Sequence, residues 1–211
     1  MSRKLGFALL GAGLLFQACS VDIFPVSSSR VKAARRVSKI EQTGPGAPGY
    51  FSHVWSFAPA QTPGIATGGG YLMDPSKVEI SGGSVHLKST GAKFPANTQI
   101  IQATSGRPFV ALDHFSEVTG PNNQGVVRYQ LSNDGQRWYW FDGSKWSSAT
   151  PHLERANSAA EVNAHIKSFT LDVGGGSLYF KALLASPNGT EPVELQKVEV
   201  AGIAPENDAW D

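Results

Sequence analysis

The chain has 211 residues, and its 18 lysines and arginines nearly balance 17 aspartates and glutamates, for a formal net charge of +1. A nucleic-acid-binding domain usually shows a clustered basic surface, so no nucleic-acid partner is expected. The single cysteine excludes an intrachain disulfide and any metal site built on several cysteines. The 23 glycines, the 13 prolines and the 10% of aromatic residues favour a turn-rich β protein.

The first residues of the chain have the pattern of a secretory signal. Arg3 and Lys4 precede an apolar run over residues 5–16. This run is too short to span a bilayer as a helix, which needs about 20 residues, but it suits the apolar region of a signal peptide. The sequence therefore predicts a lipoprotein-type signal peptide over residues 1–18.

The signal ends in L-F-Q-A-C-S, which resembles a bacterial lipobox, where a small residue precedes a cysteine that is lipidated and becomes the mature N-terminus. Ala18 fits this pattern, whereas Phe16 and Gln17 depart from it. The alternative is an ordinary signal peptide cleaved near Ala18, but the lone thiol of Cys19 would then be exposed in an oxidising compartment. The resemblance, with Ser20 in place of Asp, implies an outer-membrane lipoprotein that is anchored through Cys19 and faces either the periplasm or the exterior.

The charge is divided unevenly along the rest of the chain. Residues 20–48 contain five basic and two acidic side chains, whereas residues 49–211 contain 11 basic and 15 acidic ones. We therefore interpret residues 19–48 as a lipidated N-terminus with a flexible basic tether, residues 49–203 as the folded domain and residues 204–211 as an acidic C-terminal tail.

Short apolar segments separated by Gly, Pro, Asn and Asp begin at Tyr50. Strands are expected at residues 50–57, 70–74, 77–80, 84–88, 99–104, 108–118, 125–132, 136–141, 177–185 and 193–200. Ser158 and Glu161 form a capping-box pattern ahead of one short helix near residues 159–168. The fold class is therefore mostly β, an antiparallel β-sandwich (jelly roll) with one short helix.

Two hairpins can be assigned a register from turn chemistry. Asp134-Gly135 predicts a two-residue turn that pairs Leu131 with Trp138, and alternation then places Trp138 and Trp140 on the core face. A second hairpin is predicted to join residues 178–185 to residues 193–200 through Pro187-Asn188-Gly189, with a bulge near residues 196–197 that restores the apolar phase.

Four segments together resemble a module of bacterial surface lipoproteins and exoproteins with the concanavalin A-like lectin/laminin-G jelly roll. They are V-R-Y-Q-L-S-N-D-G-Q-R-W-Y-W-F-D-G-S-K-W (127–146), N-S-A-A-E-V-N-A-H-I-K-S-F (157–169), F-K-A-L-L-A-S-P-N-G (180–189) and V-E-L-Q-K-V-E-V (193–200). The resemblance implies an extracellular, non-catalytic β-sandwich, and it implies no particular ligand.

Binding of a glycan or an envelope protein is the function that these features favour. The predicted register turns Arg128, Gln130 and Tyr139 outward, so Tyr139 and Trp146, with Trp55 as a further candidate, would stack on a sugar while Arg128 and Gln130 supply hydrogen bonds. The alternative is a structural or assembly component of a cell-surface complex, in which the aromatic residues fill the core.

Catalysis and metal binding are less well supported. Asp113 and Glu117 lie on one face of a predicted strand, as a glycoside hydrolase would need, but jelly-roll glucanases carry a third carboxylate where this chain has Phe115. No catalytic residue, metal ligand or cofactor is therefore assigned. A structural calcium ion would have Asn133, Asp134 and Asp142 as its nearest ligands, but turn chemistry already explains these residues.

Overall fold

The computed structural model describes residues 44–57 and 70–206. The predicted signal peptide, Cys19 and most of the predicted tether therefore lie outside the described residues, as do the last residues of the predicted acidic tail. The strands that the structure describes begin at Tyr50 and end at Ile203. Within the described ranges, no helix has the length and apolar character needed to cross a membrane.

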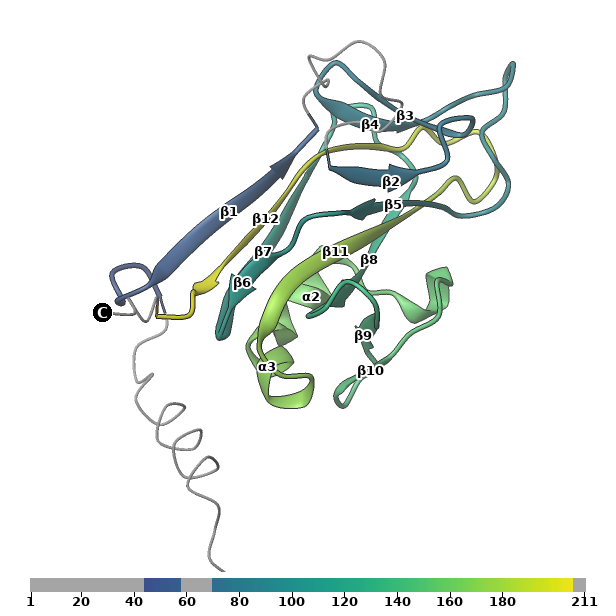
Figure 1. Ribbon diagram of the computed structural model, residues 1–211. Helices are drawn as coiled ribbons and strands as arrows, with labels where there is room; N and C mark the ends of the chain where they lie inside the picture. Colours follow the sequence, from purple (N-terminus) through teal and green to yellow (C-terminus); the bar gives the residue numbers. More distant parts are fainter. Residues whose placement is uncertain (1–43, 58–69, 207–211) are drawn as a thin grey trace, which may run out of the picture. The chain divides into compact units, whose positions relative to one another are not determined.

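Two antiparallel sheets form the domain (Figure 1). The first sheet has five strands, which are β1 (Tyr50–Ser56), β3 (Val78–Ser81), β4 (Ser84–Leu87), β7 (Ala111–Thr119) and β12 (Glu194–Ile203). The second sheet has seven strands, which are β2 (Tyr71–Met73), β5 (Gln99–Ala103), β6 (Arg107–Phe109), β8 (Val126–Ser132), β9 (Tyr139–Phe141), β10 (Trp146–Ser148) and β11 (Gly176–Ala185). The predicted mostly-β antiparallel sandwich is confirmed.

One long strand lies at the centre of each sheet. In the first sheet, β12 pairs with β7 along one edge and with β1 and β4 along the other. In the second sheet, β11 pairs with β8 along one edge and with β5 and β6 along the other. The chain segment that connects β11 to β12 therefore passes from the second sheet to the first.

Aromatic side chains from both sheets meet in the core. Trp55 of β1 packs edge-on against Phe180 of β11, with ring centroids 5.1 Å apart, and Phe115 of β7 packs against Tyr129 of β8 at the same distance. Phe115, Tyr129 and Phe180 are at most 1% exposed. Burial of large aromatic surfaces contributes a major part of the hydrophobic stabilisation of such a sandwich.

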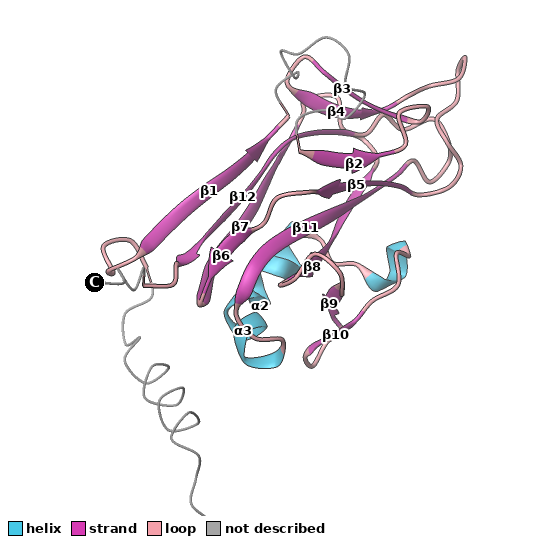
Figure 2. Ribbon diagram, in the orientation of Figure 1, coloured by secondary structure: helices cyan, strands magenta, loops and turns pink. Residues whose placement is uncertain are grey.

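A helical segment closes the sandwich beside β7 (Figure 2). It contains α2 (Ala159–His165), a 3₁₀ turn over Ile166–Ser168 and α3 (Phe169–Asp172). The predicted capping box is confirmed, because the Ser158 hydroxyl accepts from the Glu161 amide and the Glu161 carboxylate accepts from the Ser158 amide. Ile166 and Phe169 are fully buried, so their apolar contacts fix the segment against the sheets.

The predicted register of the first hairpin is wrong. Leu131 pairs with Tyr139, one residue later than predicted. The Asp134 carboxylate accepts hydrogen bonds from the amides of Gln136 and Arg137, both at 2.8 Å, so side-chain bonding builds a wider loop than a two-residue turn. Because side chains alternate, this single-residue shift places Tyr139 on the core side of β9 and turns its neighbours outward.

The predicted second hairpin is also wrong, because β11 and β12 belong to different sheets. The turn at Gly189 forms, with φ of +74°, but the Glu191 carboxylate accepts from the Ser186 hydroxyl at 2.8 Å and the Asn188 amide at 3.0 Å. These bonds shape a loop that carries the chain across the sandwich. The predicted bulge near residues 196–197 is confirmed, because the pairing of β12 with β7 shifts register between Leu195 and Lys197.

Candidate functional site

The second sheet has an outer face that points away from the core. Strand pairing aligns Leu72 with Gln102, Gln102 with Lys181, and Lys181 with Gln130, on four successive strands. Alternation from Tyr139 and Leu131, which face the core, turns Trp138 and Trp140 toward the same outer side. The outer face is defined here as Leu72, Ile100, Gln102, Arg128, Gln130, Trp138, Trp140, Lys181 and Leu183.

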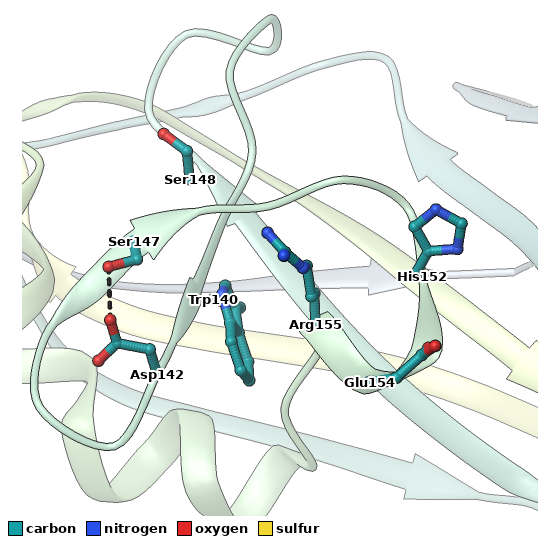
Figure 3. Close-up of a pocket in the computed structure, with 7 residues that line it drawn as sticks. All are labelled: Trp140, Asp142, Ser147, Ser148, His152, Glu154 and Arg155. Atoms are coloured by element: carbon teal, nitrogen blue, oxygen red, sulfur yellow. Dashed lines mark hydrogen bonds between the residues drawn. The ribbon is translucent and has the colours of Figure 1, made fainter.

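A pocket of about 460 Å³ lies beside Trp140 at the β9–β10 end of this face. Figure 3 shows the Trp140 indole between Asp142 on one side and Arg155 and Glu154 on the other. The complete lining is Trp140, Asp142, Ser147, Ser148, His152, Glu154 and Arg155. One aromatic ring and several hydrogen-bonding groups therefore converge on one hollow, as in many ligand sites.

Asp142 lines one side of this pocket and organises the β9–β10 turn. Its carboxylate accepts from the hydroxyls of Ser147 at 2.6 Å and Ser144 at 2.8 Å, and from the amides of Ser144 and Lys145. These hydrogen bonds, that of Ser147 above all, hold the pKa of Asp142 well below its usual range. The carboxylate therefore stays ionised, and its acceptor capacity serves the turn.

The opposite wall of the pocket is the loop that follows β10, and Gln130 holds it in place. The Gln130 side-chain amide donates to the carbonyl of Thr150 at 2.6 Å and to that of Arg155 at 2.8 Å. Because Gln130 is fully buried, its predicted role as a hydrogen-bond donor to a ligand is not compatible with its position. It is a positioning residue for the pocket loop.

Asn157 joins β8 to β9 and was not recognised from the sequence. Its backbone pairs with Tyr129 of β8, while its side-chain amide bonds both the amide and the carbonyl of Phe141 in β9. The residue is 5% exposed, so these bonds are shielded from water. An asparagine just ahead of a capping serine carries no distinctive sequence signal, which is why only the structure identifies it.

Three polar side chains of the pocket have no internal partner. Those of His152, Glu154 and Arg155 form no hydrogen bond or ion pair with any other residue in the described part of the chain. Each can therefore donate to or accept from a ligand without first losing an existing bond.

The predicted ligand-contact aromatics lie in or against the core instead. Trp146 is 4% exposed, and its indole N–H donates to the His165 carbonyl at 3.1 Å. Tyr139 packs edge-on against Phe169, and Trp55 is 5% exposed. Trp55 and Trp146 are thus almost fully buried and Tyr139 is half-buried against the core, so none of the three lies on the outer face.

Arg128 is the one predicted contact residue that lies partly exposed on the outer face. Its guanidinium forms an ion pair with the Glu161 carboxylate at 2.8 Å. Because Glu161 also completes the capping box, Arg128 links β8 to the start of α2. A ligand that used this guanidinium would compete with an existing, solvent-screened ion pair.

A second pocket, of about 410 Å³, lies at the β2–β5 end of the outer face. Its lining is Leu72, Met73, Asp74, Thr98, Gln99, Ile100 and Gln102. Leu72 is 53% exposed, so an apolar side chain is presented to solvent at this end. The outer face therefore runs between two hollows.

Comparison with known proteins found no relative. No protein-family model, curated protein or solved structure matches the chain.

The two carboxylates weighed as a catalytic pair serve separate structural contacts. Asp113 is paired with Lys167 at 2.9 Å, whereas Glu117 accepts a hydrogen bond from the buried Tyr129 hydroxyl. Phe115 between them is 1% exposed and packs in the core. Neither carboxylate lines either of the two pockets described above.

Two of the three residues considered for calcium are occupied by their own turns, whereas the Asn133 side-chain amide donates to the carbonyls of Val173 and Gly175 and its Oδ1 has no hydrogen-bond partner in the described part of the chain. Asp134 accepts from two amides and from the Arg137 guanidinium at 2.9 Å, and Asp142 is bonded as described above. Over residues 44–57 and 70–206, no group of three His, Cys, Asp or Glu side chains comes together as a metal site.

Glu117 yields a testable pH effect. Burial raises the pKa of Glu117, although the Tyr129 hydrogen bond partly opposes this shift. A carboxyl whose pKa is higher in the folded state than in the unfolded state destabilises the fold once it ionises. We therefore expect Glu117→Gln, whose amide oxygen can still accept from Tyr129, to raise Tm at pH 7 by up to a few degrees.

This gain should shrink as the pH falls through the folded pKa and vanish below about pH 4, where both states of the wild type are protonated. Thermal unfolding across this range measures it, with the exposed Glu79→Gln on β3 as the matched control. A lower Tm for Glu117→Gln than for the wild type at pH 7 would contradict the assignment.

Proposed function

We propose that this chain is a lipid-anchored bacterial surface protein whose β-sandwich is a non-catalytic binding module for carbohydrate. The observation that carries the proposal is the pocket beside Trp140, where a half-buried indole lies near three polar side chains, those of His152, Glu154 and Arg155, that have no partner in the described part of the chain. The resemblance to the concanavalin A-like lectin/laminin-G module implies a non-catalytic β-sandwich and no particular ligand, so the carbohydrate class is inferred from the pocket alone.

The pocket has the chemistry that a sugar ring requires. A pyranose has an apolar C–H face, which packs on an aromatic ring, and a rim of hydroxyls that need both donors and acceptors. Trp140 supplies the ring, Arg155 supplies donors and Glu154 supplies acceptors. The volume of about 460 Å³ falls within the range of small-molecule sites.

The carboxylates of the pocket favour binding over hydrolysis. Glycosidases need one carboxylic acid that donates a proton and a second carboxylate that acts as nucleophile or base. Asp142 is committed to the β9–β10 turn and its pKa is lowered, which leaves Glu154 as the one uncommitted carboxylate among the lining residues. A single available carboxylate suits recognition of hydroxyl groups.

Anchoring is proposed from the sequence. Cys19 follows a signal-like segment, and several acyl chains on such a cysteine would hold the protein in an outer membrane. Residues 20–48, with their excess of basic side chains, would then separate the binding domain from the lipid surface.

The binding proposal is tested by Trp140→Ala. We expect the wild-type protein to bind at least one oligosaccharide on a glycan array, and Trp140→Ala to lower its affinity about tenfold or more, because the stacking surface is lost. Isothermal titration calorimetry measures the change. Leu171→Ala, which removes a side chain that is 80% exposed in α3, is the matched control.

Trp140→Phe should lie between wild type and Trp140→Ala, since it keeps a smaller ring. Absence of any glycan binding, or binding that is insensitive to Trp140→Ala, would contradict the proposal and favour a structural role in a cell-surface assembly.

The anchoring proposal is tested by Cys19→Ser in a Gram-negative host. We expect the wild type to partition with the outer membrane and to incorporate a labelled fatty acid, and Cys19→Ser to do neither. Ser20→Asp is the matched variant, because it should stay lipidated but move to the inner-membrane fraction. Equal membrane retention and labelling of Cys19→Ser would contradict lipidation at this residue.

A further inference from the structure

Lys181 is an isolated cation at the centre of the outer face. It lies on β11, the central strand of the second sheet, and is 8% exposed. Its Nζ sits 4.2 Å from the centroid of the Trp138 ring. No carboxylate among the residues that the structure describes lies within ion-pair distance of it.

The strands on either side of Lys181 supply neutral neighbours. Gln102 of β5 and Gln130 of β8 are its partners in register. The Gln130 amide nitrogen is used by the pocket loop, while its Oε1 is buried without a hydrogen-bond partner. The next outward residue on β8, Arg128, is already paired with Glu161. Among the residues that the structure describes, no carboxylate within ion-pair distance therefore balances the charge of Lys181.

The placement of Lys181 is costly without a counter-ion. Burial lowers the pKa of its ammonium, because removal of water disfavours the charged form. The cation–π contact with Trp138 recovers part of this loss. A bound anion would recover more, because an ammonium–carboxylate or ammonium–sulfate hydrogen bond is stronger than a neutral one.

We propose that Lys181 recognises an anionic substituent, either a carboxylate or a sulfate ester, on the saccharide that binds the outer face. The inference rests on the proposed function and adds the class of ligand, an acidic glycan. Trp138 covers one side of the ammonium, and the N–H groups that point away from the ring donate to the anion. Lys181 and the Trp140 pocket then contact different parts of one chain-like ligand, since Lys181 is paired with Gln130 and Gln130 holds the pocket loop.

The test compares acidic saccharides with neutral counterparts that have the same backbone. One arm uses oligogalacturonate and its carboxyl-reduced form, and the other uses a sulfated oligosaccharide and its desulfated form. Calorimetry at low salt on the full chain is run for the wild type, for Lys181→Met, and for Lys93→Met as a control that removes an exposed lysine in the loop before β5. Thermal unfolding checks the fold, and replacement of an unpaired buried cation by methionine should not lower Tm.

We expect the wild type to prefer the acidic member of at least one pair about tenfold or more, and Lys181→Met to abolish that preference while keeping the affinity for the neutral member. Lys93→Met should keep the preference. The arm that shows the effect identifies the anion as carboxylate or sulfate.

Four results would overturn the inference. One is equal affinity of the wild type for acidic and neutral ligands, and another is an acidic preference that survives in Lys181→Met. Either result would contradict the anion-binding role of Lys181 but not the carbohydrate-binding proposal. An equal loss of acidic preference in Lys93→Met would show that the preference depends on the net charge of the protein and not on Lys181. Failure to bind any saccharide would overturn the proposed function and this inference with it.

Discussion

The pairing of Leu131 with Tyr139 is the constraint on which the candidate site depends. Successive side chains on a strand point to opposite faces, so one register decides the face of every aromatic residue in β9. With this register, Tyr139 and Phe141 pack against the core and Trp140 faces outward. A slip of one residue would exchange the two sets, burying the tryptophans and exposing the tyrosine.

Local signals predicted much of the fold. Most strand positions, the capping box at Ser158 and the bulge near Gln196 depend on a few adjacent residues, so the sequence was sufficient for them. The register at Asp134 was not predictable, because its side chain competes with the backbone for the turn amides. The assignment of β11 and β12 to different sheets depends on long-range pairing, which no turn motif reports.

The candidate site was predicted less well, because it too depends on contacts between residues that are far apart in the sequence. Gln130 and Arg128 were correctly turned outward, but Gln130 is buried under a loop whose position no local sequence signal indicates. Trp146 lies in a short strand that was not predicted, and the helical segment covers it. What remains partly exposed on the outer face is the pair Trp138 and Trp140, beside side chains that have no partner within the described residues. These groups carry the binding proposal, because their hydrogen-bonding capacity is not used within the described part of the chain.

Acrylamide quenching of tryptophan fluorescence tests the outward orientation of Trp138 and Trp140 most directly. The measurement uses a Trp210→Phe background, since Trp210 lies outside the described residues, and compares Trp138→Phe/Trp140→Phe with Trp55→Phe/Trp146→Phe. Trp55 and Trp146 are at most 5% exposed. Removal of Trp138 and Trp140 should therefore eliminate most of the accessible emission, and removal of Trp55 and Trp146 should leave it. The opposite pattern would show that the tryptophans of β9 face the core and would contradict the register.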